Sequence, residues 1–161
     1  MTPYSDVFDS FRGLLIRDDR FFKEPPKEIL EVRMVKLLKH AVTNMMLVKD
    51  KRDFEINFMS IMDDALMQFN EELTLLEIDL LAYFMWQCYI EEEVVVRLRE
   101  LKNIGFRDDE IAAFSPSGTV KEFRSTYNLL VHENINRVKE YKRRGRLDFK
   151  LKTHKFRFGE E

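Results

Sequence analysis

The stretch from Thr74 to Lys102 constrains the fold most strongly, because it is long, rich in apolar residues and free of glycine and proline. Thr74 and Glu77 have the spacing of a capping box, in which each side chain binds the backbone N–H of the other residue at the start of a helix. Gly105 follows shortly after Lys102, and glycine often stands just past the end of a helix. The pattern therefore predicts a long helix over about 74–102.

The first half of this predicted helix is apolar on nearly every side, whereas the second half keeps only a narrow apolar stripe. A helix that is apolar all round is usually buried, so we expect the first half to be central to the fold. Its apolar residues are Leu75, Leu76, Ile78, Leu80, Leu81, Tyr83, Phe84, Met85, Trp86, Tyr89 and Ile90, and those of the second half are Val94, Val95, Leu98 and Leu101.

Glycine and proline are scarce throughout, with 5 and 4 among 161 residues, which favours long helices over the many turns of an all-β fold. Apolar residues recur with helical spacing over about 5–17, 27–48 and 119–143, so three further helices are expected there. Ser5 is a suitable N-cap for the first helix, because its hydroxyl can accept a hydrogen bond from a free backbone N–H.

The segment 49–69 has a mixed pattern. Residues 49–55 are highly charged, which is typical of a loop. Phe54, Ile56 and Phe58 alternate with other residues, as in a short strand, and the apolar residues that follow return to helical spacing. We therefore expect a short strand near 54–58 and a short helix over 59–69.

The chain is thus expected to be an all-α bundle of about four helices, formed by residues 1–144, with an extended, β-like C-terminal arm, residues 145–161. Apolar residues of the arm alternate with polar ones, which is the pattern of a strand. A single strand is not stable alone, so the arm either pairs with residues 54–58, another subunit or a partner's sheet edge, or stays flexible. Its apolar residues, the candidate docking anchors, are Leu147, Phe149, Leu151, Phe156 and Phe158.

The net charge of −2 hides an uneven distribution. From Lys139 to Arg157 there are nine Lys and Arg residues and two acidic ones, a balance of +7, whereas the rest of the chain has 18 basic and 27 acidic residues, a balance of −9. An acidic body therefore carries a basic C-terminal segment. The basic residues that we expect to pair with acidic neighbours or phosphate are Arg143, Arg144, Arg146, Lys150 and Lys152.

The basic arm has three possible functions. In a nucleic-acid-binding regulator, its cations would displace counterions from phosphates and its Phe rings would stack on bases. In a docking arm, the backbone would extend a partner's sheet while the apolar residues fill pockets. In a flexible solubilising tail, five large apolar residues would be exposed to water, which invites aggregation. The alternation favours the docking arm.

No pattern in the sequence indicates an enzyme, a cofactor or a metal site. His40, His132 and His154 are far apart, and the first two lie in predicted helices, where an exposed or partly buried position is expected. Cys88 lies in the most apolar helix and is expected to be buried, since a reactive thiol needs exposure and a nearby positive group. The single cysteine excludes an internal disulfide.

Two acidic clusters remain, Glu91-Glu92-Glu93 and Asp108-Asp109-Glu110. Both lack the alternating ligands and the glycine of a calcium loop, so an exposed helix face and a helix start explain them more simply. No apolar run has the length of a membrane-spanning helix, and the N-terminus lacks the pattern of a signal peptide. We therefore expect no membrane contact, and a protein that stays in a reducing cytoplasm or joins something assembled there.

Three groups of motifs stand out: Tyr4-Ser5-Asp6-Val7-Phe8; Gln68-Phe69-Asn70-Glu71-Glu72-Leu73-Thr74 with Glu77-Ile78 and Leu80-Leu81-Ala82; and Phe114-Ser115-Pro116 followed by Lys121-Glu122-Phe123. With these motifs the chain resembles small helical proteins of tailed phages and prophages of Gram-positive hosts. The resemblance covers about 4–22 and 68–143, and it leaves out 49–67 and the residues after Arg144.

The resemblance implies a head–tail adaptor, or head-completion protein, in the virion neck. Such a subunit would form a homo-oligomeric ring below the portal protein and contact other neck or tail proteins, with assembly and sealing as its only activity. An acidic body suits a ring around packaged DNA, because like charge keeps the phosphates from binding. Another helical interaction module of the neck or tail is the alternative that the resemblance leaves open.

Overall fold

The structure, a computed structural model, describes residues 1–15, 26–103 and 119–145. These residues form four helices and a small three-stranded sheet, so the predicted, mostly helical body is confirmed and the sheet is an addition to the expected all-α class. The helices are α1 (Tyr4–Leu14), α3 (Lys27–Met46), α4 (Leu75–Asn103) and α6 (Thr119–Arg144), and the strands are β1 (Thr2–Pro3), β2 (Met62–Asp63) and β3 (Gln68–Phe69). Except for Gly145, the predicted arm 145–161 lies outside the described residues.

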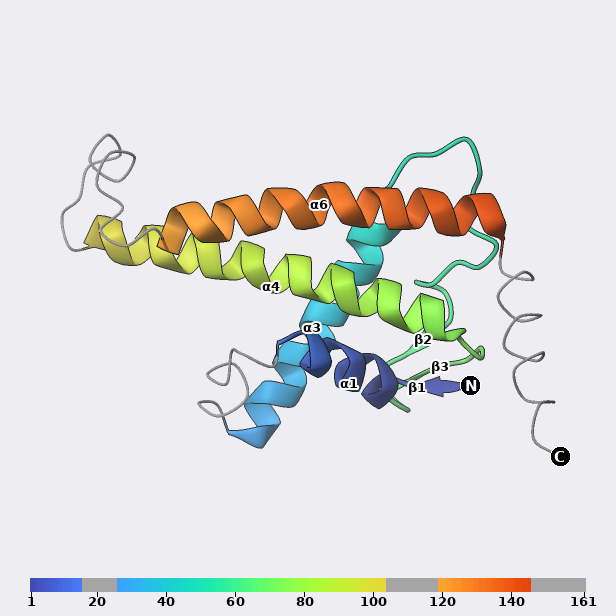
Figure 1. The fold of residues 1–161 in the computed structure, drawn as a ribbon. Coiled ribbons are helices and arrows are strands. Elements are labelled where there is room, and N and C mark those ends of the chain that lie inside the picture. The colour runs from blue at the N-terminus through green and yellow to red at the C-terminus, as the bar shows by residue number, and fades with distance from the viewer. Residues whose placement is uncertain (16–25, 104–118, 146–161) are drawn as a thin grey trace, which may run out of the picture.

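Helix α4 lies at the centre, as its composition predicts (Figure 1). Helices α1, α3 and α6 all pack against it. Helix α6 runs antiparallel to α4 at its side, α3 crosses behind α4 in the view of Figure 1, and α1 lies against its N-terminal half. Three of the four described helices therefore depend on α4 for most of their tertiary contacts.

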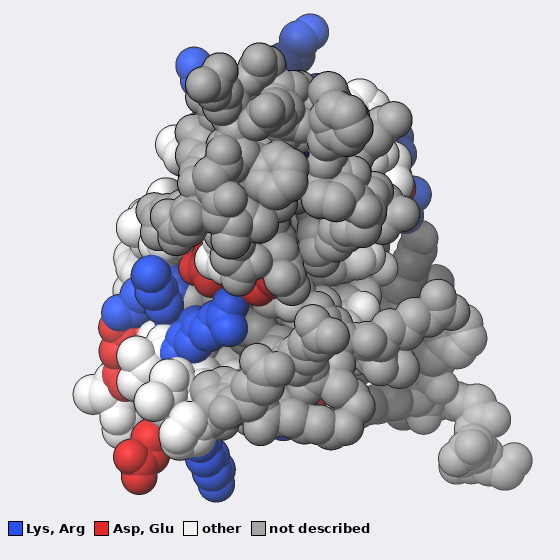
Figure 2. Space-filling view, turned by 90° about the vertical axis from the view of Figure 1, so that its left-hand side faces the viewer, with Lys and Arg blue, Asp and Glu red and all other residues white. Residues whose placement is uncertain are grey.

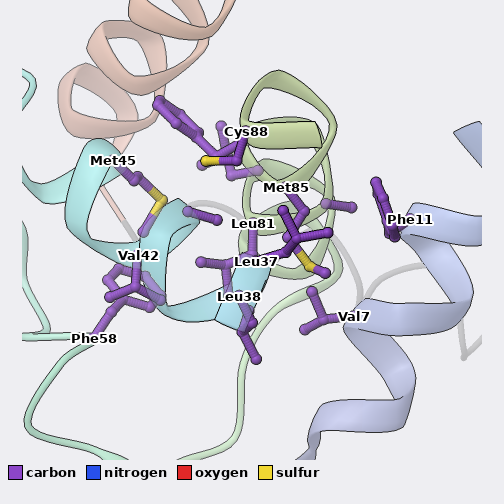
Figure 3. Close-up of a cluster of buried hydrophobic side chains, with 14 of the residues drawn as sticks. Val7, Phe11, Leu37, Leu38, Val42, Met45, Phe58, Leu81, Met85 and Cys88 are labelled. Atoms are coloured by element: carbon purple, nitrogen blue, oxygen red, sulfur yellow. The ribbon is translucent and has the colours of Figure 1, made fainter. Parts of the chain in front are cut away.

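The core is formed where α1, α3 and α4 meet, and Figure 3 shows their side chains pointing toward one another. Val7 and Phe11 of α1 and Leu81 of α4 are fully buried. Each such side chain contributes about 1.5–3 kcal/mol by leaving water. The predicted apolar stripe of α3 is confirmed: its fully buried members are Met34, Leu37, Leu38, Ala41, Val42 and Met45.

The segment 54–69 differs from both predictions made for it. Residues 54–58 form no strand, and 59–69 form no helix but contain β2 and β3, which pair antiparallel in a sheet of order β1-β3-β2. Asp63 Oδ1 accepts hydrogen bonds from the backbone N–H groups of Ala65 and Leu66 (both 3.1 Å), and Met67 has a φ of 53°. Side-chain bonds to the local backbone compete with a helix, and a positive φ ends one.

The start of α1 also differs from the prediction, because Ser5 is not its N-cap. The helix begins at Tyr4 after Pro3, and no side chain caps it. Instead, the backbone N–H of Tyr4 donates to the carbonyl of Met67 (2.9 Å). The turn between β2 and β3 thus satisfies a backbone donor that a capping hydroxyl would otherwise bind.

The capping box at the start of α4 is confirmed. The Thr74 N–H donates to Glu77 Oε2 (2.6 Å), and the Glu77 N–H donates to the Thr74 hydroxyl (3.3 Å). Glu77 is fully buried, and its other carboxylate oxygen accepts a hydrogen bond from the hydroxyl of Tyr141. The cap therefore also joins the first turn of α4 to the last turns of α6.

Candidate docking site

Helix α6 ends at a tightly fixed point. The Gly145 N–H donates to the carbonyl of Tyr141 (2.9 Å), and Gly145 has a φ of 73°, a left-handed conformation that glycine adopts without strain. A Cβ at Gly145 would lie 2.8 Å from a carboxylate oxygen of Glu55. Glycine therefore ends the helix and lets the chain pass close to the 49–57 loop.

Two long basic side chains hold this loop against α6. Arg52 Nη1 donates to the carbonyl of Arg143 (2.6 Å), and Lys142 Nζ donates to the carbonyl of Val48 (2.9 Å). The Lys142 ammonium also lies 4.3 Å from the centre of the Phe54 ring, a cation–π distance. Lys142 is buried, so this residue, which the sequence placed in the basic C-terminal segment, is part of the body.

A hollow of about 530 Å³ opens between the end of α3, the loop and the end of α6. We call it the C-terminal hollow. Its apolar wall is only partly covered, since Met46, Val48 and Phe54 are half-buried and Leu47 is 70% exposed. A second hollow of about 390 Å³ shares Leu47 and Val48 with it and continues along α6. The end of α3 is thus flanked by open, partly apolar surface.

The predicted site residues lie mostly beyond this point. Arg143 and Arg144 are the two that the structure describes, and both bind Glu140 within α6: Arg143 donates to its carboxylate at 2.9 and 2.7 Å, and Arg144 donates to the same group. The hydrogen bond from Arg143 is the main reason that the pKa of Glu140 falls to about 2. The predicted site residues that lie outside the described residues are Arg146, Leu147, Phe149, Lys150, Leu151, Lys152, Phe156 and Phe158.

A second polar contact between α4 and α6 has no counterpart in the sequence prediction. Asn134 is fully buried and donates to the carbonyl of Tyr83 (3.2 Å) and to Gln87 Oε1 (3.0 Å). Arg137 donates to Asn134 Oδ1 (3.0 Å) and lies 3.8 Å over the Tyr83 ring. Asn134 stands four residues after Leu130 and four before Val138, which are both buried on the same face of α6. This spacing is the signal in the sequence that indicates a buried side chain.

His40, His132 and Cys88 lie where the sequence predicts, and His154 lies outside the described residues. His40 and His132 are exposed, and Cys88 is buried. Burial, followed by the negative charge of Glu91, raises the pKa of the Cys88 thiol to about 12. The thiol is therefore protonated near neutral pH, which does not suit a nucleophile.

Two acidic residues of α4, Glu92 and Glu93, form ion pairs with Arg33 of α3. Arg33 lies 3.5 Å from Glu92 and 3.9 Å from Glu93. Within residues 1–15, 26–103 and 119–145, no three His, Cys, Asp or Glu side chains lie close enough together to hold a metal ion. The cluster Glu91-Glu92-Glu93, expected on a solvated helix face, therefore has a basic partner on α3, Arg33.

The surface carries both signs of charge. In Figure 2, which faces the left-hand end of Figure 1, basic and acidic side chains lie beside one another on the described part of this face. None of the described helices has an apolar run long enough to cross a membrane.

Comparison with protein-family models, curated proteins and solved structures finds no match to this chain. Its function is therefore inferred from the sequence motifs and from the geometry above.

Proposed function

We propose that this chain is a structural subunit of the neck of a tailed phage: a head–tail adaptor that forms a ring below the portal and docks through its C-terminal arm, residues 145–161. Its activity would be assembly and sealing of the virion, without catalysis or a cofactor. The observation that carries the proposal is that two separate stretches resembling neck proteins, 4–8 and 68–74, pack together in the fold.

Contacts between these two stretches are direct. Tyr4 and Phe69 are fully buried, and their rings meet edge to face with centroids 5.0 Å apart. Thr2, just before the first stretch, pairs with Phe69 between β1 and β3, and its hydroxyl accepts a hydrogen bond from the Leu73 N–H (2.8 Å). The resemblance therefore covers one packed unit at the start of α4, which supports a shared architecture over a chance likeness of short segments.

The end of α6 supports a protein partner over nucleic acid. Lys142 is buried, and Arg143 and Arg144 bind Glu140. A phosphate-binding surface would thus depend on Lys139 and on residues after Gly145, which is a smaller basic region than the sequence suggests. The apolar anchors of the arm are unaffected by this change.

The test is binding of the full chain to the portal protein encoded in the same genome, followed by native mass measurement. We expect a complex that contains several copies of this chain per portal assembly. The variant Leu147→Ser/Phe149→Ser/Leu151→Ser is expected to bind more weakly while keeping its helical content. Val32→Ser is the matched control, because Val32 is exposed on α3, far from the arm in sequence.

Two results would count against the proposal. Absence of any complex with the portal would remove the adaptor function, and full binding by the triple variant would remove the arm as its means of docking. Binding to DNA that falls steeply with rising salt would instead favour the nucleic-acid-binding regulator, because phosphate contacts release counterions.

A further inference from the structure

We propose that the C-terminal hollow is a docking site for the first part of the chain's own arm, Leu147, Phe149 and Leu151, in the free subunit. The occupant is therefore a segment of the same molecule. This goes beyond the adaptor function, because it concerns the subunit before any partner binds and holds whatever that partner is.

The hollow is large enough to hold apolar side chains, and five of its ten lining residues are apolar. Its volume of about 530 Å³ lies within the range of pockets that enclose drug-sized ligands, about 300–1,000 Å³. Met46, Val48 and Phe54 line it and are only half-buried, and Leu47 at its edge is 70% exposed. Covering these side chains would remove apolar surface from water, which is favourable in proportion to the area covered.

The chain leaves the body next to this hollow. Lys142 lines it and stands three residues before Gly145, a separation of less than one helical turn. Gly145 itself is held beside Glu55, and Arg52 fixes the carbonyl of Arg143. The exit of the arm is therefore fixed relative to the loop that forms one wall of the hollow.

The anchors are within reach of the hollow. Leu151 is six residues beyond Gly145, which allows a span of at most about 20 Å for an extended chain. A short tether of this kind gives an effective concentration of about millimolar for binding within the same molecule. A weak apolar contact is thus sufficient to keep the arm docked in a dilute, free subunit.

The alternation of the arm matches a hollow with an apolar wall and a charged rim. In an extended segment Leu147, Phe149 and Leu151 share one face, while Lys150 and Lys152 lie on the other. The lining of the hollow carries both signs of charge, since Asp50, Asp53 and Lys49 are exposed and Lys142 is buried. The apolar face would contact the wall, while the other face, which also carries Asp148, would stay toward water and these charged side chains.

Docking in the same molecule would make the arm unavailable until a partner displaces it. A partner that binds the arm must then compete with the C-terminal hollow. The apparent affinity of the partner for the arm is its intrinsic affinity multiplied by the fraction of chains whose arm is undocked. Assembly would accordingly be slower in a free subunit than in one whose hollow is blocked or whose loop is altered.

A spin label on the arm tests this proposal in the full chain. Lys150→Cys places a label between the anchors, and native Cys88 stays unlabelled because it is buried and protonated. Amide signals of residues 46–57 should lose most of their intensity in an isotope-labelled chain that carries the spin label. The loss should not change on dilution, and it should disappear when Leu147, Phe149 and Leu151 are all changed to Ser.

A mixed sample separates the same molecule from a second copy. Isotope-labelled chains without the spin label are mixed with spin-labelled chains without the isotope, and no loss of signal is expected. Signal loss in the mixture would overturn the proposal in favour of arm exchange between copies. Unchanged signals of 46–57 in the doubly labelled chain would overturn it in favour of an undocked arm. Neither result bears on portal binding, so the adaptor function is tested separately.

Discussion

The corner where the chain begins and the corner where α6 ends are both built from short irregular segments packed on long helices, but only the first is closed. At the first corner Tyr4 and Phe69 are fully buried, and their rings meet edge to face. At the second, Val48 and Phe54 are half-buried beside a hollow of about 530 Å³. The same chain thus completes one apolar contact region and leaves the other partly open.

The two corners differ in the kind of contact that holds them together. At the closed corner, backbone pairing of β1 with β3 is combined with buried aromatic rings, and the Tyr4 hydroxyl also donates to Asp64 (3.1 Å). At the open corner, Arg52 and Lys142 bind backbone carbonyls of the facing segment. These long side chains fix the position of the loop without filling the space beside it. An open region held in place in this way is suited to receive another segment.

The largest expected effect is a difference in the free energy of unfolding between two variants, each of which truncates one aromatic residue, one at each corner. Phe69→Ala should lower the free energy of unfolding by about 3–5 kcal/mol, because it leaves a cavity in a closed region. Phe54→Ala should cost less, about 1–2 kcal/mol, since its ring is only half-buried. Urea unfolding followed by circular dichroism measures both. Equal losses would mean that the two corners are packed to the same degree.

The next effect concerns the polar contact that joins α4 to α6 beneath the open corner. Tyr141→Phe removes the hydroxyl that donates to buried Glu77 and should lower the free energy of unfolding by about 1–3 kcal/mol. Tyr127→Phe is the control, because Tyr127 is a half-buried residue of the same helix. If the two variants had the same stability, the Glu77–Tyr141 bond would not hold the ends of these helices together.

A smaller effect depends on pH and is specific to the closed corner. Burial, and then the hydrogen bond with Asp64, raise the pKa of Tyr4 above its usual value. Below the unfolded-state pKa of about 10 the neutral phenol is present in both states, and above it the unfolded chain ionises first, so stability falls as pH rises. Tyr4→Phe should therefore lose less unfolding free energy than the natural chain between about pH 9 and pH 11. Parallel curves for the two proteins would show that Tyr4 does not carry this dependence.

The smallest effect is expected at the exposed end of α6. Glu140→Gln removes the carboxylate that binds Arg143 and Arg144, but ion pairs on the surface add little to stability because water and salt screen them. Thermal unfolding should be nearly unchanged, both at low and at high salt. A clear loss of stability at low salt would indicate that this pair helps to end the helix at Gly145.

Local patterns explain which parts of the fold could be predicted. The capping box of Thr74 and Glu77 and the apolar stripes of the helices depend on neighbours within a few residues, so the bounds of α4 and α6 follow within one residue of expectation. The pairing of β3 with β1 joins residues more than sixty positions apart. No local pattern contains that information, and the turn at Met67 with its positive φ hides it further.

The C-terminal hollow could not be predicted, for a similar reason. Alternation of apolar residues after Gly145 is visible in the sequence, but the hollow next to Gly145 is formed by α3, the 49–57 loop and α6 together. Lys142 illustrates the limit: a basic residue in a basic segment is expected in water, yet the Val48 carbonyl and the Phe54 ring hold it in the body. Its place three residues after Lys139 and one after Tyr141 does not reveal those partners.

We propose that this chain assembles below a portal through its arm. Native mass measurement of the full chain with the portal protein of the same genome tests it most directly. We expect a complex with several copies of the chain per portal assembly, which is lost or weakened when Leu147, Phe149 and Leu151 are changed to Ser. A chain that stays monomeric and unbound in the presence of the assembled portal would contradict it.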